Sequence, residues 1–580
     1  MDVVVRDGVT VIDGEPRVLV SADYPYYRDD PSVWADRLVA IRDALGIDVI
    51  TCYLPWRHHQ PDPGVAPDFT TGSRDVTGFL RLCHELGLKV IAKPGPFIHA
   101  ETDFGGLPDW VSPDADPAIE ALLDASGTPQ RWGATLPAPL GEVFAQLNAA
   151  WLAAVGEQVL DAAAHPAGPV ILVQIANEGV YTNGALPLDA YDHSPSGLAF
   201  RAALGDDDPG RFHAAYLGGI YRRWADATGF AGPVVVNLNP PTIDDLDAWL
   251  ARVRPPAWDR IHYGFTNWMG VVSADPDAWF RYVVAAKLAP GPNLEENWGF
   301  SELYDRAYAD AATSFHQTLL AMAAGATGFN IYTGVATSTW SPALDSRHAP
   351  PYPDCPPIGP DGEATVKAPV VKALAGFFAA HGVEFLECVP VTGGAFGLWA
   401  SCGAELRAFH DAIRESGRDY ALVDLEHATP EQVLRHPVLT VPAGLPRLAL
   451  LDSYTEAGGR VRTGPPDGDA AVRVVSGDAD AFLRQHPGRD VAYLTVLARS
   501  TCEGPVVVEA AEVRVEATMA RGGAAIVRLT GGEADDLIVK GINGYLDSAV
   551  AASLTVAGRT AGAGTPADLV RIGGRTRVLS

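Results

Sequence analysis

The chain has 580 residues, of which 47% are hydrophobic and 20% charged, and its mean hydropathy is near zero at +0.05. This composition allows a large buried core and excludes a disordered or collagen-like chain. The net charge of −28 argues against the basic surface that nucleic acids and anionic lipids require, so neither is expected as a partner.

The cysteines and the N-terminus bear on cofactors and location. The 6 cysteines form no Cys-x-x-Cys pair, and no histidine cluster has metal-ligand spacing, so the sequence predicts no metal site and no cofactor. Scattered free thiols are typical of a reducing compartment. Residues 1–16 lack the pattern of a secretory signal, and no apolar run reaches the length of a membrane span. We therefore expect a cytoplasmic protein without a membrane anchor.

Eight short apolar runs alternate with longer amphipathic stretches up to about residue 380. Such runs are typical of buried parallel strands, each of which needs a crossover helix. The helix-like stretches between them include residues 33–46 and 315–326. No glycine-rich phosphate loop follows the first run, so a (β/α)8 TIM barrel fits better than a dinucleotide-binding fold. The eight runs cover residues 17–28, 48–56, 89–98, 169–179, 233–241, 261–268, 293–300 and 327–334.

The last third of the chain has a different pattern of hydrophobic and polar residues. Residues 404–417 have the pattern of a helix, and 420–425 and 436–443 that of strands, which indicates a small α/β domain. From about residue 468, short strands separated by turns indicate an antiparallel β-sandwich. The predicted boundaries are 1–385 for the barrel, 386–466 for the α/β domain and 467–580 for the sandwich.

Nearly all of the eight apolar runs end in polar, aromatic and proline residues. The C-terminal ends of the strands form the catalytic face of a barrel. Aromatic rings with carboxylates and amides, and few cationic groups, suit a neutral polyhydroxylated ligand, which points to carbohydrate. These residues include Tyr24 to Tyr27, Trp56 to Gln60, Ala100, Glu101, Asn177, Glu178, Asn237, Asn239, Asn267, Trp268, Glu296 to Trp298, and Tyr332.

Two glutamates at strand ends are candidates for catalysis. Glu178 closes the fourth run and Glu296 the seventh, on opposite sides of a barrel mouth. A retaining glycosidase needs two carboxyl groups about 5–5.5 Å apart. Glu178, in apolar surroundings beside a second carboxylate, is expected to stay protonated as the acid and base, and Glu296 to stay ionised as the nucleophile. Asn177 would bind the sugar 2-hydroxyl. Because adjacent strand residues point in opposite directions, only one of Glu295 and Glu296 faces the mouth.

Several stretches resemble glycoside hydrolase family 35, the β-galactosidase family of the clan with catalytic glutamates on barrel strands four and seven. The resemblance covers about residues 17–180. It rests on 33–56, on the Pro-Gly-Pro and Ala-Glu stretch 94–111 and on 174–179, and more weakly on 295–299. It implies Glu178 as acid/base and favours Glu296 over Glu295 as nucleophile. The residues that match the sugar-holding positions are Tyr53, Ala100, Glu101 and Asn177, with Tyr352 as a weaker match.

The middle segment, 392–463, also resembles the flavodoxin-like domain of the related family 42. In the proteins of that family, this domain helps subunits associate. The resemblance therefore implies a flavodoxin-like α/β domain and is consistent with a homo-oligomer. The expected function is that of a retaining exo-β-glycosidase acting on a small oligosaccharide or glycoside, most simply a β-galactosidase.

Three segments differ from the family's usual sequence, at Pro25-Tyr26, at 56–61 and at 333–337. Members of the family act on other sugars, so a β-glycosidase or transglycosylase for glucose, glucosamine, fucose or arabinose is the alternative. Trp298 is a candidate sugar-stacking platform or a core residue. Arg57 either binds an anionic group of the substrate or pairs with an aspartate, and the acidic tract 206–208 is interpreted as a solvated loop.

Overall fold

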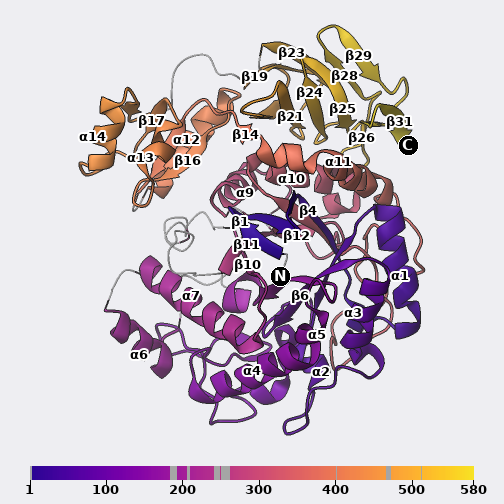
Figure 1. Ribbon diagram of the computed structural model, residues 1–580, viewed down its shortest axis with the longest axis vertical. Helices are drawn as coiled ribbons and strands as arrows, with labels where there is room; N and C mark the ends of the chain where they lie inside the picture. The colour runs from indigo at the N-terminus through magenta and orange to yellow at the C-terminus, as the bar shows by residue number, and fades with distance from the viewer. Residues whose placement is uncertain are drawn as a thin grey trace. The chain divides into compact units, whose positions relative to one another are not determined.

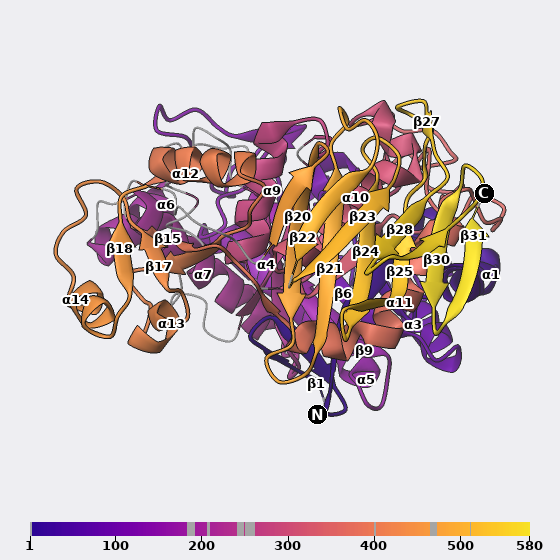
Figure 2. The same ribbon diagram turned by 90° about the horizontal axis from the view of Figure 1, so that it is seen from above.

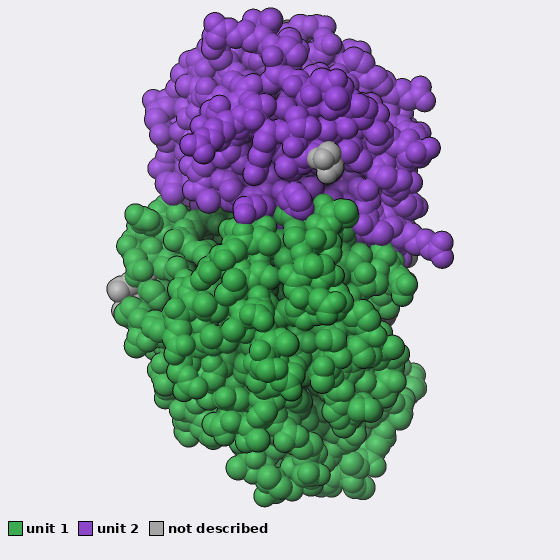
Figure 3. Space-filling view, turned by 90° about the vertical axis from the view of Figure 1, so that its right-hand side faces the viewer, with its two compact units in different colours: residues 1–268, 289–303, 327–368 green, residues 269–288, 304–326, 369–580 purple. Residues whose placement is uncertain are grey.

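The computed structural model describes the chain except for residues 1–2, 183–191, 206–208, 241–248, 250–260, 269, 290, 400–401, 465–471, 511 and 580. The acidic tract 206–208 thus lies outside the described residues. The chain divides into two compact units (Figure 3). Unit 1 holds residues 1–268, 289–303 and 327–368, and unit 2 holds 269–288, 304–326 and 369–580. The predicted domain boundaries stay predictions.

Unit 1 contains a closed barrel of eight parallel strands (Figure 1). Each strand lies within one of the eight apolar runs, so the predicted barrel is confirmed. Nearly all of the strand residues with described side chains are buried, as expected for parallel strands covered on both faces. The strands are β4 (Leu19–Asp23), β5 (Val49–Tyr53), β6 (Lys89–Gly95), β9 (Val170–Ile175), β10 (Val234–Leu238), β11 (Ile261–Asn267), β12 (Asn293–Asn297) and β13 (Gly328–Tyr332).

Helices follow the barrel strands as the amphipathic stretches predict. The stretch 33–46 forms α1 (Trp34–Ala40) and a wider turn that ends at Gly46, whose φ of 70° reverses the chain. At the start of α3 (Val76–Glu85), the carboxylate of Asp75 accepts a hydrogen bond from the backbone N–H of Gly78 at 2.8 Å. The other α-helices among the described residues of unit 1 are α2 (Trp56–His59), α4 (Glu142–Val155), α5 (Asp161–Ala163), α6 (Pro195–Leu204) and α7 (Pro209–Thr228). Three antiparallel strands, β1 (Val3–Arg6), β2 (Val9–Ile12) and β3 (Glu15–Arg17), precede the barrel.

Unit 2 contains a four-stranded parallel sheet in the order β16-β15-β17-β18. In chain order that arrangement is 2-1-3-4, which is the start of the flavodoxin-like order. The first and central strand, β15 (Ala395–Leu398), was not among the predicted strands. The other elements are α12 (Gly403–Glu415), β16 (Ala421–Asp424), α13 (Pro430–Leu434), β17 (Val438–Thr440), α14 (Ala449–Glu456) and β18 (Arg460–Arg462).

The C-terminal part of unit 2 is antiparallel, as the turn-rich pattern predicts. A seven-stranded sheet and a five-stranded sheet share a core that includes Leu494, Val496, Val527 and Leu554 (Figure 2). The larger sheet holds β14 (Val389–Pro390), β20 (Ala479–Gln485), β21 (Val491–Ala498), β24 (Ala524–Thr530), β25 (Glu533–Val539), β30 (Asp568–Ile572) and β31 (Arg575–Leu579). The smaller sheet holds β19 (Val472–Ser476), β22 (Val506–Ala510), β23 (Val513–Thr518), β28 (Ser553–Val556) and β29 (Arg559–Gly562).

Three longer helices complete unit 2: α9 (Pro276–Leu288), α10 (Ala311–Ala324) and α11 (Ala368–Glu387). The predicted helix at 315–326 corresponds to α10, all of whose residues are buried. By length and composition, α11 alone among the described helices could cross a membrane. Half of its apolar window is buried inside the protein, which is the property of a core helix.

Candidate active site

Strand β9 ends in a strained turn that carries Asn177 and Glu178. Ala176 and Glu178 have φ values of 61° and 52°, in the left-handed region that non-glycine residues rarely adopt. Such strain concentrates at functional sites, where surrounding contacts must hold it. Here the backbone N–H of Glu178 donates to Oδ1 of Asn237 at 2.8 Å, which anchors the turn to the end of β10.

The amide of Asn177 has one fixed orientation. Its Oδ1 accepts hydrogen bonds from the hydroxyl of Tyr53 (2.9 Å), from Nε2 of Gln174 (3.1 Å) and from Nδ2 of Asn237 (2.7 Å). Three donors on one oxygen leave the Nδ2 group of Asn177 to point the other way. No described residue accepts a hydrogen bond from this Nδ2, so it is available to a ligand oxygen.

Across the barrel mouth, Glu295 and not Glu296 joins this network. The hydroxyl of Tyr53 shares its single proton between Oδ1 of Asn177 and Oε1 of Glu295, while Oγ1 of Thr266 and Nε1 of Trp268 donate to Oε2 at 3.0 and 3.1 Å. Tyr53 thus touches both Asn177 and Glu295, and it ties the ends of strands four and seven together.

The prediction that Glu296 faces the mouth is wrong. Its side chain is fully buried, and Oε2 accepts a hydrogen bond from Nδ2 of Asn293 at 2.6 Å. The register of β12 shifts against both neighbouring strands between Asn293 and Glu296, so β12 carries a bulge beside the site. A bulge redirects a side chain relative to simple alternation.

Glu101 is a third carboxylate at the mouth, after β6. His99, Ala100 and Glu101 all have φ values between 43° and 56°, a run of three left-handed residues. The buried guanidinium of Arg28 holds this run by donating to the carbonyl of Glu101 at 2.9 Å. The hydroxyl of Tyr332 donates to Oε2 of Glu101 at 3.0 Å.

The electrostatics separate the roles of these carboxyl groups. Burial raises the pKa of Glu178 well above its usual range, and the negative charges of Glu295 and Glu101 raise it further. Burial also raises the pKa of Glu101 to about 7, although Arg28 opposes the shift. Of the carboxyl groups at the mouth, Glu178 is therefore the one suited to act as an acid.

A buried ion pair lies below the mouth inside the barrel. Nζ of Lys93 lies 3.9 Å from Oδ1 of Asp23 and 4.5 Å from the centre of the Tyr53 ring. Desolvation raises the pKa of Asp23 to about 6, against the charge of Lys93 and the hydrogen bond from Thr51. This cation supports the tyrosine that joins Asn177 to Glu295.

The remaining predicted sugar-binding residues differ in accessibility. Ala100 is buried in the left-handed run, and its carbonyl lies 3.4 Å from Nη2 of Arg28. Tyr352 is half-buried, and its ring meets that of Phe300 edge-on with the ring centres 5.4 Å apart. Trp298 is fully buried, so its ring offers no surface to a sugar and the stacking prediction is wrong. The half-buried Trp268 is the tryptophan that reaches the carboxylate network.

The divergent segment 56–61 is occupied by structural contacts. Arg57 forms a two-pronged ion pair with Asp109, at 2.7 and 2.8 Å, which agrees with the second of its two interpretations. His59 is buried against the hydroxyl of Tyr26 (2.9 Å), and burial lowers the pKa of its imidazole to about 3. Both side chains are therefore engaged by other residues of the chain.

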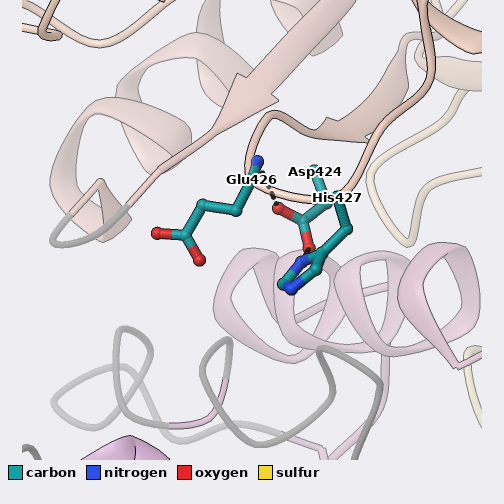
Figure 4. A group of neighbouring side chains, drawn as sticks. All are labelled: Asp424, Glu426 and His427. Atoms are coloured by element: carbon teal, nitrogen blue, oxygen red, sulfur yellow. Dashed lines mark hydrogen bonds and ion pairs between the residues drawn. The ribbon is translucent and has the colours of Figure 1, made fainter.

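One group of potential metal ligands lies outside the barrel, at Asp424, Glu426 and His427 (Figure 4). Nδ1 of His427 lies 2.8 Å from Oδ2 of Asp424. Exposed acidic groups of this kind are common without an ion. The expectation of no resident metal stays a prediction.

Several functional side chains were not assigned a role from sequence. Asn237, Asn239, Trp268 and Tyr332 were visible as polar or aromatic residues at strand ends, and that signal could have added them to the site. The side chains of Arg28 and Lys93 gave no such signal, because their contacts come from segments far apart in the chain.

Comparison with known proteins confirms the predicted resemblance. Residues 10–121 match Glycosyl hydrolases family 35. The beta-galactosidase of Mus musculus is 36% identical over 173 residues, which cover 29% of this chain and 22% of the relative. The chain thus spans about a fifth of that relative's length.

Solved structures match over nearly the whole chain at low identity, and they show the fold alone. The beta-galactosidase of Marinomonas ef1 superposes with a TM-score of 0.55 at 14% identity, covering 96% of this chain and 88% of its own. A family 42 beta-galactosidase of G. stearothermophilus gives 0.56 at 10% identity, covering 97% and 98%.

Proposed function

We propose that this chain, whose residues 10–121 match family 35 of the glycosyl hydrolases, is a retaining exo-β-glycosidase and most simply a β-galactosidase. The observation that carries the proposal is the network at the barrel mouth. In this network, Tyr53 joins Glu295 to Asn177, the residue before Glu178, and the pKa of Glu178 is raised. An acid and a nucleophile at the ends of strands four and seven are what double displacement requires.

In the first step, a carboxylate oxygen of Glu295 attacks the anomeric carbon as the glycosidic C–O bond breaks. Glu178 gives its proton to the leaving oxygen, so the aglycone departs neutral. The donors from Tyr53, Thr266 and Trp268 hold the attacking carboxylate in one orientation.

In the second step, Glu178 is a carboxylate and takes a proton from water. The water oxygen attacks the anomeric carbon, the ester to Glu295 breaks, and the sugar leaves with its original anomeric configuration. The Nδ2 group of Asn177 would donate to the sugar 2-hydroxyl, a bond that strengthens as positive charge develops on the ring.

The pH dependence follows from the charges around Glu178. Activity should fall as the pH rises through the pKa of Glu178, because the acid is then lost. In Glu101→Gln, one of the charges that raise this pKa is removed, so the alkaline limb of kcat/KM should move to lower pH. Profiles of the wild type, Glu101→Gln and the exposed control Glu142→Gln measure the shift. A move to higher pH would mean that the limb belongs to Glu101.

A screen of the purified chain tests the function itself. Aryl β-glycosides of galactose, glucose, glucosamine, fucose, xylose and arabinose would be supplied with and without an acceptor sugar. Release from the galactoside alone supports a β-galactosidase, and release from another sugar supports the alternative specificity. If no glycoside is cleaved or transferred, the proposal fails.

The substrate size, the cellular compartment and the oligomeric state are also part of the proposal. The substrate would be a small oligosaccharide or glycoside, and the 6 cysteines, all free, suit the predicted cytoplasm. The flavodoxin-like sheet of unit 2 supports the proposal of a homo-oligomer.

A further inference from the structure

The bulge in β12 lies between Asn293 and Glu296, and it includes Glu295. Asn293 pairs with Phe329 of β13 and Glu296 with Ile331, so one more residue of β12 than of β13 lies between the two pairs. The pairing of β12 with β11 shifts in the same part of the strand. An extra residue interrupts the alternation of side chains, so the contacts that hold the bulge determine which of the adjacent glutamates faces the mouth.

The side chain of Asn293 binds both glutamates. Its Oδ1 accepts a hydrogen bond from the backbone N–H of Glu295 at 3.1 Å, and its Nδ2 donates to Oε2 of Glu296 at 2.6 Å. Because a backbone N–H can only donate, the amide of Asn293 has one orientation. A side chain that binds the N–H two residues further on replaces a bond of the strand ladder. One amide thus holds the backbone of Glu295 and retains the carboxylate of Glu296.

Asparagine is chemically suited to this pair of bonds. The N–H of Glu295 needs an acceptor and the buried carboxylate of Glu296 needs a donor, and an amide supplies both. An ionised aspartate has no donor, and it would place a second carboxylate against Glu296. A hydrocarbon side chain would remove both bonds, at the cost of leaving buried polar groups without this partner.

The carbonyl of Leu294, inside the bulge, is held from the barrel interior. It accepts a hydrogen bond from Nδ2 of Asn330 at 2.9 Å and from Nζ of Lys93 at 3.4 Å. Lys93 lies on β6, which is not a neighbour of β12 in the barrel, so the carbonyl points into the interior. The hydroxyl of Ser21 donates to Oδ1 of Asn330 at 2.9 Å and fixes the orientation of that amide. The backbone before Glu295 is therefore fixed on both sides of its peptide bond.

We propose that Asn293 is a positioning residue that makes Glu295, and not Glu296, the nucleophile. It acts through the backbone of the bulge, and Lys93 and Asn330 support it by holding the carbonyl of the intervening residue. The inference rests on the proposed function, because it concerns the carboxylate that would attack the anomeric carbon. Asn293 itself is fully buried and does not touch the sugar.

The test separates the rate of reaction from binding. The 2-deoxy-2-fluoro glycosyl fluoride of the sugar identified by the screen gives a rate constant for covalent labelling and a separate constant for binding. Asn293→Ala removes both side-chain bonds, so the labelling rate constant should fall by about 10²-fold, because the carboxylate is displaced from the anomeric carbon. The binding constant should stay within about threefold of the wild-type value, since no contact to the sugar is lost.

A donor–acceptor exchange gives the matched rescue. Asn293→Asp keeps the acceptor for the N–H of Glu295 but sets two carboxyl groups against each other, so the labelling rate constant should also fall. Adding Glu296→Gln supplies the missing donor from the other side. The Asn293→Asp/Glu296→Gln double variant should recover to within about threefold of Glu296→Gln alone.

A second buried asparagine controls for a loss of stability. The side chain of Asn543, in unit 2, accepts a hydrogen bond from the N–H of Leu546 at 3.1 Å and donates to the carbonyl of Arg521 at 2.9 Å. Asn543→Ala should therefore lower Tm as Asn293→Ala does, but the labelling rate constant should not change. All variants are compared at one temperature below their unfolding transitions.

Three results would overturn the proposal: a labelling rate constant in Asn293→Ala within about threefold of the wild type, a loss confined to binding, or no recovery in the double variant. A label on Glu296 in the wild type would also overturn it, although the chain would still be a retaining glycosidase. If the wild type neither cleaves a glycoside nor takes a label, the proposed function fails, and the role of Asn293 fails with it.

Discussion

Replacing Glu295 by Gln should lower kcat by roughly 10⁴-fold or more, because the carboxylate that forms the covalent bond is lost. The fold and the binding of substrate should persist, since an amide can still accept from Thr266 and Trp268. The measurement is steady-state hydrolysis of an activated aryl glycoside. In Glu295→Ala, azide should restore turnover and yield a glycosyl azide of inverted configuration.

The matched control is the adjacent Glu296→Gln. Its carboxylate is buried against Asn293, so the change should affect stability more than chemistry, and azide should have no effect. If Glu296→Gln instead shows the larger loss of kcat and the azide product, then the bulge in β12 has been misinterpreted and Glu296 is the nucleophile.

Replacing Glu178 by Ala should have a different signature. Loss of the general acid should lower kcat/KM by about 10² to 10⁴-fold for substrates with poor leaving groups. A dinitrophenyl glycoside, which leaves without a proton, should lose much less in the first step. Azide should accelerate the second step and give a product of retained configuration, because the glycosyl–Glu295 ester still forms.

The opposite anomeric outcomes for the two variants separate the two roles in one assay. The product of each reaction with azide is assigned by nuclear magnetic resonance. Equal losses for good and poor leaving groups in Glu178→Ala would contradict the assignment of Glu178 as the acid.

The barrel could be predicted from sequence because its signal is repeated and local. Each of the eight strands lies within an apolar run, and nearly all of the runs end in polar or aromatic residues. The small parallel sheet was harder to predict in full, because its central strand β15 has only four residues, although its neighbours β16 and β17 lie within the predicted strands. Its strand order depends on contacts between segments far apart in the chain.

The two glutamates that we propose as catalytic differ in how far the sequence identifies them. Glu178 follows a long apolar strand. Its neighbours are Asn177 and Gly179, so no second glutamate competes with it for the same role. Glu295 and Glu296 are adjacent, and alternation predicts only that one of them faces inward. The bulge that decides between them is a property of the pairing of β12 with β11 and β13, which the sequence of β12 alone does not contain.

Trp298 makes the same point for aromatic residues. Trp298 is in the catalytic motif, yet packing buries it completely. Exposure of an aromatic ring is set by the surrounding fold and not by its neighbours in sequence.

The most direct test of the central claim is to trap the covalent intermediate. The 2-deoxy-2-fluoro glycosyl fluoride of the preferred sugar forms an ester that breaks down slowly, and mass spectrometry of the digested protein locates it. Our account predicts one label per chain, on Glu295. A label on Glu296, or normal turnover with an inverted product and no label, would contradict it.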